Sequence, residues 1–523
     1  MKAIRSLIIS LASFAALSLI AITFASPSAL AQEPVATVSV ETQPLGILIP
    51  KDFVGISLEV STAGQGIGAF APGGETTASA PPVAEYALGT PEKPNEAFFQ
   101  FMRNLGPGVL RMGGNSQDNT CWDPAAAPHP DWCKAEISKA DFALYSRAAK
   151  ESGWRLIVGI NLKQNSSEWA LEEVTQALAP AIKPGETVGL EIGNEPDLFS
   201  RDGSRPKTYS PADHAKDFLA YRDAFAKNAT ARQYGIVGPA TCCAWRNAQD
   251  LGVFIDGVGA SNLNLISIHN YPLTTCNGRT VTVQQLLAPE TITRFDGQMR
   301  SLAAAAHDRK LPIVLAETNS ASCGGMPGVS NAFAAALWGM STLYSAVEDG
   351  LSGVNFHISY RPGGSAYNAI DTYAAAGGSA QEVYKNVAEP LYYGMYLFAQ
   401  NASGEYLLPA NIQTNSNIRA YATMACSNCA VHVVLLNEDV TASGRVAVHL
   451  PNRKGTAQLL FLNAPKLSAP ASDVRYGGGQ FDQAGHIGVP QMQQVKADAD
   501  GDYDFDLPNA AAAVLIVPGE GAR

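Results

Sequence analysis

The chain has 523 residues, 46% of them hydrophobic, with 36 basic and 47 acidic side chains and a formal net charge of −11. Such an acidic balance repels nucleic acid and long polyanions, so we expect no nucleic acid partner, and a long polyanion is disfavoured as a ligand. The length exceeds one ordinary compact domain and fits a large domain with one accessory domain.

Residues 1–31 show the pattern of a signal peptide. Lys2 and Arg5 form a positive segment, residues 7–24 are apolar, and Ala-Leu-Ala at 29–31 is a cleavage site. An uncleaved membrane anchor is the alternative, because the apolar run is nearly long enough to span a bilayer. The cleavage site favours export, so we expect a secreted or periplasmic protein without membrane attachment after cleavage.

Short apolar runs alternate with helix-length segments from residue 51 onward, for example a predicted helix over 211–228. The predicted strands are 54–58, 109–112, 156–160, 188–192, 235–238, 265–268, 313–316 and 354–356. Eight strand-helix repeats predict a parallel (β/α)8 TIM barrel. A doubly wound sheet is disfavoured because residues 58–61, after the first strand, lack a glycine-rich phosphate loop.

The remaining segments complete the predicted domain organisation. Residues 61–97 form a long loop, which is either a functional wall or a simple insertion. After residue 385, alternating strands separated by turns predict a C-terminal β-sandwich. The predicted parts are a signal peptide (1–31), a strand joining the sandwich (32–50), the catalytic barrel (51–384) and the β-sandwich (385–523).

Eight cysteines in an exported chain predict structural disulfides, whose connectivity the sequence leaves open. Cys121 with Cys133, and Cys426 with Cys429, are close enough for local pairs. Zinc is the competing interpretation of the second pair, but no other ligand pair lies nearby. We therefore expect a disulfide rather than a zinc site at Cys426 and Cys429.

Polar residues that directly follow barrel strands are candidates for an active site, because the C-terminal ends of the strands meet at one face. Glu195 follows the fourth strand, next to Asn194, and Glu317 ends the seventh. Two carboxylates with separated pKa values are what cleavage of a glycosidic bond requires. The pair therefore predicts a glycoside hydrolase.

Four motifs resemble glycoside hydrolase family 79, the β-glucuronidases and heparanase, within clan A of the retaining glycosidases. They are GLEIGNEP at 189–196, LAETNS at 315–320, VLRMGG at 109–114 and PLYYG at 390–394. The likeness extends over residues 55–398. Asn-Glu-Pro alone marks the clan, whereas the combined set marks the family.

The resemblance implies a role for each matching residue. Glu195 would be the general acid/base and Glu317 the nucleophile. Asn194 would bind the sugar 2-hydroxyl, Tyr271 would hold the nucleophile, and Glu59 would bind other sugar hydroxyls.

The family receives the uronic carboxylate mainly through backbone N–H groups and a tyrosine hydroxyl. This implies Gly324, Gly325 and Tyr367 as its ligands here. Ser322-Cys323 departs from the tyrosine and glycine expected at this point, and we hypothesise a disulfide between Cys323 and Cys276 that braces the pocket.

The resemblance implies a retaining β-glucuronidase that needs no metal and no cofactor. The acidic surface favours exo action on terminal glucuronic acid or its 4-O-methyl form, and we expect a monomer. Another clan A activity, such as glucosidase, xylosidase or arabinofuranosidase, is the main alternative. An endo-β-glucuronidase of the heparanase type is disfavoured by the acidic surface. A sugar-binding protein without catalysis would need the two glutamates to be too far apart for displacement.

Overall fold

The structure is a computed structural model that describes residues 33–42, 46–60, 87–122, 130–359, 365–374, 384–451 and 453–519. The predicted signal peptide lies outside the described residues, as does most of the predicted loop at 61–97. The chain from Pro34 onward forms one compact unit. Within the described part of the chain, no helix has both the length and the hydrophobicity needed to cross a lipid bilayer.

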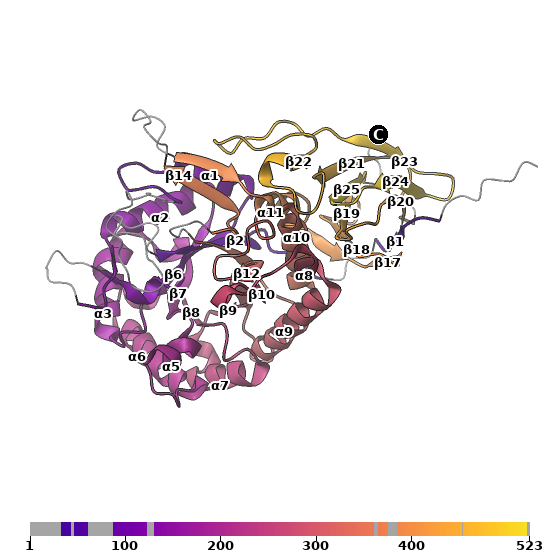
Figure 1. Cartoon of the computed structure of the whole chain (residues 1–523). Helices are drawn as coiled ribbons and strands as arrows, with labels where there is room; N and C mark the ends of the chain where they lie inside the picture. The colour runs from indigo at the N-terminus through magenta and orange to yellow at the C-terminus, as the bar shows by residue number, and fades with distance from the viewer. Residues whose placement is uncertain are drawn as a thin grey trace, which may run out of the picture. The chain divides into compact units, whose positions relative to one another are not determined.

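Parallel strands close into an eight-stranded barrel in the order β11-β13-β2-β3-β6-β7-β8-β9 (Figure 1). These strands are β2 (Val54–Glu59), β3 (Val109–Gly113), β6 (Arg155–Ile160), β7 (Thr187–Ile192), β8 (Ile236–Thr241), β9 (Leu265–His269), β11 (Ile313–Thr318) and β13 (Val354–Ile358). Each one overlaps a strand predicted from the sequence. β8 differs most, because it continues three residues beyond its predicted end at Gly238.

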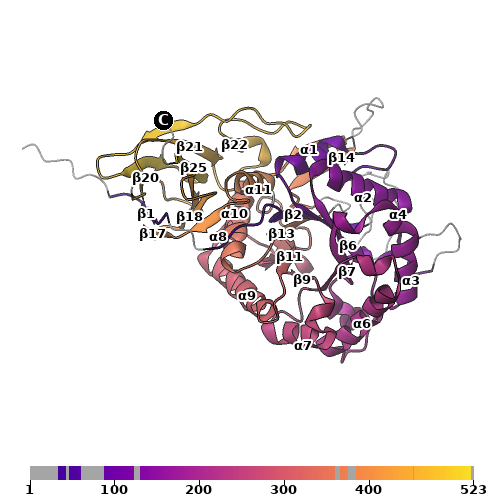
Figure 2. The ribbon, with the colours of Figure 1, turned by 180° about the vertical axis from the view of Figure 1, so that it is seen from behind.

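Helices alternate with the barrel strands and cover their outer side, as Figure 2 shows for α6, α7 and α9. They are α1 (Glu96–Asn104), α2 (Lys139–Ser152), α3 (Ser167–Glu172), α6 (Pro211–Lys227), α7 (Ala248–Val258), α9 (Pro289–His307), α10 (Phe333–Glu348) and α11 (Pro390–Asn401). Capping boxes start α2 and α6, where Ser138 pairs with Asp141 and Ser210 with Asp213. Each box satisfies backbone N–H groups that the first helical turn leaves without partners.

The inside of the barrel changes from apolar to polar along the strands. A separate cluster of buried aliphatic side chains fills the interior: Val109, Ile157, Val237, Leu265, Val314 and Ala316. Because inward-facing positions recur every second residue, Arg111 follows Val109 on the same face of β3. Ser57, Arg111 and Glu191 are fully buried. The polar side chains therefore lie next to a layer of aliphatic side chains inside the barrel.

Two consecutive glycines at the end of β3 make room for this polar layer. A Cβ atom on Gly113 would lie 2.6 Å from the guanidinium carbon of Arg111. One on Gly114, whose φ is +77°, would lie 2.5 Å from Oε2 of Glu59. The VLRMGG motif thus pairs a buried arginine with the space that it and a neighbouring carboxylate occupy.

The C-terminal part forms two sheets that face one core. The four-stranded sheet has the order β17-β1-β20-β24, with β17 (Ala410–Thr414), β1 (Ala36–Val40), β20 (Gly444–His449) and β24 (Asp502–Leu507). The larger sheet contains β16 (Tyr406–Leu408), β18 (Ile418–Met424), β19 (Val431–Asn437), β25 (Ala511–Val517), β21 (Thr456–Asn463), β22 (Arg475–Tyr476) and β23 (Gln493–Lys496). Side chains of both sheets, such as Val446 and Val433, share one buried cluster. The predicted (β/α)8 barrel with a C-terminal β-sandwich is therefore confirmed.

Short elements complete the described chain. They are β4 (Thr120–Trp122), β5 (Ala135–Ile137), β10 (Leu273–Thr274), β12 (Ala321–Ser322), β14 (Ile370–Ala374), β15 (Tyr384–Ala388), α4 (Ala179–Ala181), α5 (Phe199–Asp202) and α8 (Val283–Leu287). The pair β10–β12 is parallel and joins the loops that follow β9 and β11. That pairing lies beside the candidate site described below.

Helix α10 is buried around its whole circumference and contacts both the barrel and the sandwich. Every side chain from Phe333 to Val347 is buried. The Phe333 N–H donates to the carbonyl of Ala469 at 2.9 Å, and the ring of Tyr344 stacks on Tyr421 of β18 with centroids 4.3 Å apart. A mostly apolar helix that is buried on every side needs protein all round it, and the sandwich covers one of those sides.

Candidate active site

The catalytic and sugar-contacting residues predicted from the sequence lie at the C-terminal ends of the barrel strands. They are Glu59 on β2, Asn194 and Glu195 after β7, Tyr271 after β9 and Glu317 on β11. The buried side chains of Arg111 on β3, His269 on β9 and His357 on β13 join them. The sequence assigned no role to these three residues.

Glu195 and Glu317 face each other across the barrel mouth. Three atoms lie within 4.8 Å of one another: a carboxylate oxygen of Glu195, a carboxylate oxygen of Glu317 and a ring nitrogen of His269. Their side chains are only 14% and 8% exposed. This separation matches the carboxyl spacing of about 5 Å in retaining glycosidases rather than the roughly 6.5–9.5 Å in inverting ones.

Glu317 is held in its ionised form by donors on both oxygens. The Tyr271 hydroxyl donates to Oε1 at 2.8 Å, and Arg111 Nη1 donates to Oε2 at 2.8 Å. Burial would raise the pKa of this carboxyl, but His357, Arg111 and the Tyr271 hydrogen bond outweigh burial and lower the pKa well below its usual range. The carboxylate is therefore available as a nucleophile at neutral pH.

Glu195 has the opposite electrostatic surroundings. Burial raises its pKa well above the usual range, and the negative charges of Glu317 and Asp197 raise it further. His269 Nδ1 lies 3.2 Å from Glu195 Oε1, and burial lowers the pKa of this histidine to about 4. The surroundings of Glu195 therefore favour its protonated form, and His269 is neutral at pH 7, so the pKa values of the two carboxyls are shifted in opposite directions.

Arg111 connects the two glutamate-bearing strands beneath the site. Its Nε donates to Glu191 Oε2 at 2.6 Å, Nη1 also donates to Ser57 Oγ at 3.0 Å, and Nη2 donates to Asn194 Oδ1 at 2.9 Å. The whole side chain is buried. Glu191, which had no assigned role, is thus a partner of the arginine that orients Glu317 and Asn194.

Glu59 lies at the edge of the same network. It accepts hydrogen bonds from the N–H and hydroxyl of Ser116 at 2.8 and 2.6 Å, and His357 Nε2 lies 3.5 Å away. Burial raises the pKa of Glu59, but His357 and Ser116 outweigh burial and lower it. The ionised carboxylate has acceptor capacity for sugar hydroxyls.

The predicted carboxylate ligands lie together beside Tyr271. Gly324 and Gly325 have φ values of +89° and +77°, a region that favours glycine. A Cβ on Gly325 would lie 3.0 Å from the Cβ of Tyr367, so these two segments are in direct contact. The rings of Tyr367 and Tyr271 have centroids 6.4 Å apart. The structure therefore brings the predicted uronate ligands to the side of the pocket occupied by Glu317.

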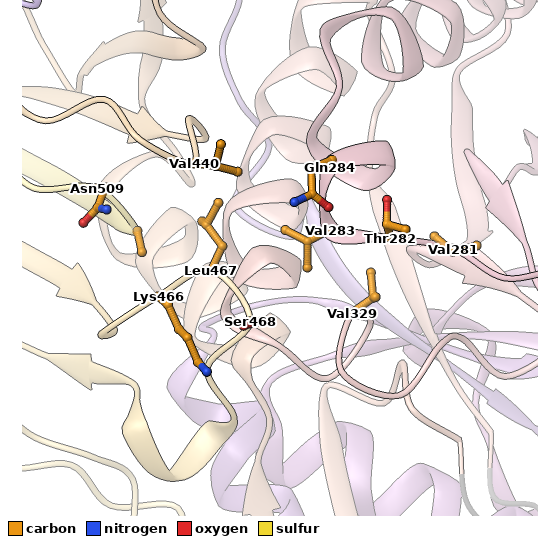
Figure 3. A pocket seen from close by; sticks show the side chains of 11 residues that line it. Val281, Thr282, Val283, Gln284, Val329, Val440, Lys466, Leu467, Ser468 and Asn509 are labelled. Carbon is orange, nitrogen blue, oxygen red and sulfur yellow. The ribbon is translucent and has the colours of Figure 1, made fainter.

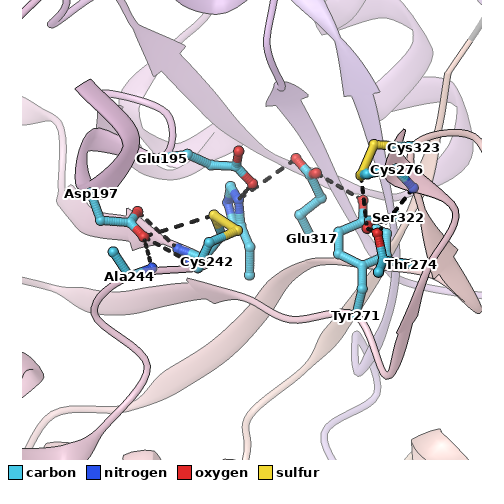
Figure 4. The surroundings of a disulfide bond; sticks show 12 residues. Glu195, Asp197, Cys242, Ala244, Tyr271, Thr274, Cys276, Glu317, Ser322 and Cys323 are labelled. Carbon is cyan, nitrogen blue, oxygen red and sulfur yellow. Dashed lines mark hydrogen bonds and ion pairs between the residues drawn. A yellow bond between two sulfur atoms is a disulfide. The ribbon is translucent and has the colours of Figure 1, made fainter. Parts of the chain in front are cut away.

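A disulfide joins Cys276 to Cys323 directly before this glycine pair, as hypothesised from the sequence. The Thr275 N–H and hydroxyl also donate to the carbonyl of Ser322, at 3.1 and 2.8 Å. These contacts connect the loop after β9 to the loop after β11 (Figure 4). The two locally paired disulfides, Cys121–Cys133 and Cys426–Cys429, are present as well.

The fourth disulfide joins the adjacent residues Cys242 and Cys243, immediately after β8. Asp197, which lies five residues beyond the end of β7, accepts their backbone N–H groups. The sequence analysis missed this feature, because it ended the fifth strand at Gly238. Two consecutive cysteines beyond a barrel strand were the available signal.

Among the residues that the structure describes, two groups of side chains have the spacing of metal ligands, but their chemistry fits a metal poorly. The first contains Glu195 with Cys242 and Cys243, whose sulfurs are joined in a disulfide and offer no thiolate. The second is Glu195, His269 and Glu317, in which Arg111 and Tyr271 already bind both oxygens of Glu317. The expectation of a metal-free enzyme stays a prediction.

A separate pocket of about 430 Å³ lies between α8 and loops of the sandwich (Figure 3). Its lining is Val281, Thr282, Val283, Gln284, Val329, Val440, Lys466, Leu467, Ser468, Asn509 and Ala510. This set contains none of the paired carboxylates or their partners. We therefore place the candidate active site at the barrel mouth rather than in this pocket.

The chain matches no protein-family model. It is 28% identical over 406 residues to a β-glucuronidase of Aspergillus niger, which covers 71% of this chain and 70% of that protein. It is 26% identical over 420 residues to a β-glucuronidase of Neurospora crassa, covering 70% and 72%. A heparanase of Gallus gallus is 26% identical over 250 residues, covering 45% and 44%.

Solved structures share the fold over nearly the whole chain. A 4-O-α-L-rhamnosyl-β-D-glucuronidase from Fusarium oxysporum superimposes with a TM-score of 0.70 at 19% identity, covering 92% of this chain and 100% of that one. A family 51 arabinofuranosidase from Xanthomonas axonopodis pv. citri gives a TM-score of 0.65 at 15% identity, covering 93% and 100%. The predicted resemblance is therefore confirmed: the chain is a relative of the β-glucuronidases and heparanase of glycoside hydrolase family 79, with the clan A fold.

Proposed function

We propose that the protein is a retaining exo-β-glucuronidase that releases terminal β-linked glucuronic acid, or its 4-O-methyl form, by double displacement. The observation that supports this proposal is the pair Glu195 and Glu317. Their oxygens lie within 4.8 Å, and their surroundings shift the two pKa values in opposite directions. One acid and one base at this spacing are suited to cleavage with retention of configuration.

In the first step, Glu317 attacks the anomeric carbon while Glu195 gives its proton to the glycosidic oxygen. The bond from carbon to the leaving oxygen breaks, and an ester forms between the sugar and Glu317. Tyr271 and Arg111 position the attacking carboxylate through their hydrogen bonds to its two oxygens. The leaving group departs as a neutral alcohol.

In the second step, Glu195 acts as a base. Esterification of Glu317 removes a negative charge that had raised the pKa of Glu195, so that pKa falls. The resulting carboxylate takes a proton from water, which attacks the anomeric carbon and releases Glu317. The same charge interaction thus changes the role of Glu195 between the two steps.

The sugar hydroxyls are assigned to the polar groups around this pair. Asn194 Oδ1 accepts a hydrogen bond from Arg111, which leaves its NH₂ group as a donor toward the 2-hydroxyl. Such a bond strengthens as positive charge develops at the anomeric carbon. Glu59 accepts from hydroxyls farther from the reacting carbon.

The uronic carboxylate is assigned to the backbone N–H groups of Gly324 and Gly325 and to the hydroxyl of Tyr367. The contact between Gly325 and Tyr367 supports a single binding site made of these groups. Exo action is favoured over endo action on sulfated polymers by the net charge of −11. The predicted secretion and monomeric state belong to this proposal too.

Paired aryl β-glycosides test the sugar specificity. We expect the glucuronide to have a kcat/KM at least about 100-fold above the matching glucoside and xyloside, because a neutral sugar leaves the carboxylate ligands without a partner. Steady-state kinetics with one aryl group on all three sugars isolates this effect. A preference for glucoside or xyloside would contradict the glucuronidase assignment while keeping both glutamates in their roles.

The pH profile of kcat/KM tests the two ionisations. Activity needs Glu317 ionised and Glu195 protonated, so it falls as pH drops through the low pKa of Glu317 and as pH rises through the high pKa of Glu195. We expect a broad plateau between the two limbs. With an activated aryl leaving group, Glu195→Gln should lose the alkaline limb, and its persistence would assign that limb to another group.

A further inference from the structure

The loop that follows β8 places an exposed disulfide next to the proposed acid/base. The sulfurs of Cys242 and Cys243 and one carboxylate oxygen of Glu195 lie within 4.8 Å of one another. Cys242 is buried, whereas Cys243 is exposed. A ring closed between adjacent residues has little freedom, so these sulfurs present a fixed surface at the barrel mouth.

The disulfide and the nucleophile contact the acid/base from different directions. Figure 4 shows Cys242 between Asp197 and Glu195, whereas Glu317 and Tyr271 approach from the other side. The Cys242 Sγ lies 3.8 Å from Asp197 Oδ2. The donor sugar must lie between the two glutamates, so the disulfide is outside the donor site.

The position of the disulfide relative to Glu195 indicates which part of the substrate it faces. In double displacement, the acid/base contacts the glycosidic oxygen, and the leaving group extends beyond that oxygen. A surface within 4.8 Å of Glu195, on the side away from Glu317, therefore lies beside the leaving group.

Hydrogen bonds hold this surface against the segment after β7 and against helix α9. The carboxylate of Asp197 accepts N–H bonds from Cys242, Cys243 and Ala244 at 3.1, 2.7 and 2.6 Å. Gln298 donates to the carbonyl of Arg246 at 3.1 Å. Asp197 is only two residues from Glu195, so the disulfide and the acid/base are held in one arrangement.

The chemistry of the disulfide selects an apolar partner. Disulfide sulfur is polarisable and offers no N–H or O–H donor, so it binds C–H and π surfaces better than hydroxyl groups. Its neighbours, by contrast, are carboxylates and backbone amides that suit polar ligands. A flat ring presents an apolar face to such a surface and its polar edge to the surrounding groups.

We propose that the Cys242–Cys243 disulfide forms the floor of the leaving-group subsite and binds the apolar face of the ring attached to the glucuronosyl group. The proposal rests on the proposed function, because it assigns Glu195 as the acid/base. The shared chemistry is a six-membered ring face, which an aryl aglycone or a pyranose can supply. The disulfide is thus a determinant of aglycone specificity.

The test removes the disulfide and varies only the leaving group. Kinetics of the Cys242→Ala/Cys243→Ala variant are measured with glucuronosyl fluoride, an aryl glucuronide and a glucuronosyl-xylose disaccharide. The matched control is Cys426→Ala/Cys429→Ala, which removes a disulfide from the sandwich. Fluoride is too small to reach the sulfurs, so it reports on the donor site alone.

We expect kcat/KM to fall about tenfold for the substrates with ring leaving groups, mainly through KM, and to stay unchanged for the fluoride. The inhibition constant of free glucuronic acid should not change, and the control variant should match the wild type. A loss for the aryl substrate alone, or for the disaccharide alone, identifies which ring the subsite takes. Both outcomes support the proposal.

Two results would overturn it. An equal loss on fluoride and ring substrates would show that the disulfide only maintains the donor site, and unchanged kinetics on all three would remove any contact with the leaving group. If instead the proposed glucuronidase function is wrong, the kinetics show a different pattern. In that case the wild-type enzyme prefers a neutral sugar, and the same fluoride-to-ring comparison on that sugar still tests the subsite.

Discussion

Replacing Glu317 with alanine lowers kcat for an aryl β-glucuronide by at least about 10⁴-fold, the scale seen when a nucleophile is removed from an enzyme. The variant lacks the carboxylate that forms the covalent intermediate, and the remaining carboxyl, Glu195, is on the proton-donating side. The substitution also removes the carboxylate to which Arg111 Nη1 and the Tyr271 hydroxyl donate their hydrogen bonds. Steady-state and single-turnover assays measure the loss.

The Glu317 prediction has an additional readout in product stereochemistry. Added azide can occupy the space of the missing carboxylate and attack directly, which gives a glucuronosyl azide of inverted, α configuration. An exposed glutamate of α9, replaced in Glu290→Ala, is the matched control and should retain wild-type rates. Wild-type activity in the Glu317 variant would move the nucleophile to another residue.

Replacing Glu195 with alanine gives a loss that depends on the leaving group. Poor leaving groups need the proton that Glu195 donates, so we expect kcat/KM for them to fall by about 10²–10⁴-fold. Activated aryl groups leave without protonation, so their first step should change little while their second step becomes slow. A plot of log kcat/KM against the pKa of the leaving group should become steeper than in the wild type.

Azide again separates the roles of the two glutamates. In Glu195→Ala it attacks the glycosyl-enzyme formed on Glu317 without needing a base, so the product has retained, β configuration. The two alanine variants therefore yield opposite azide anomers. A loss that is the same for good and poor leaving groups would argue against proton donation by Glu195.

Much of the fold followed from the hydrophobic pattern. Each predicted barrel strand overlaps an observed one. The reason is that strands of a parallel barrel are short apolar runs, which loop and turn residues separate from the helices. The error at the fifth strand has a physical cause. Gly238-Pro239 has the composition of a turn, yet Pro239 and Ala240 lie within β8. Contacts with neighbouring strands outweigh local preference there.

A site residue was predictable from the sequence where its position at the end of one strand suggests its role. It was less predictable where the role depends on contacts with several strands at once. Glu195 and Glu317 were recognised because each is a carboxylate at a strand end, although their roles stay predictions. The role of Arg111 was missed, since it depends on simultaneous contacts with Glu191, Asn194 and Glu317. Pairing of Cys242 with Cys243 depends on local backbone geometry that composition does not report.

The complete burial of α10 sets a limit on engineering this enzyme into a smaller catalyst. A truncated protein that ends after the barrel would expose the side of α10 that Tyr421 and the loop at Ala469 now cover. That surface would expose side chains that are now buried, among them the aromatic ring of Tyr344, which favours aggregation over a soluble minimal enzyme. Shortened versions of this catalyst should therefore be sought by trimming loops of the sandwich, with the strands that face α10 retained.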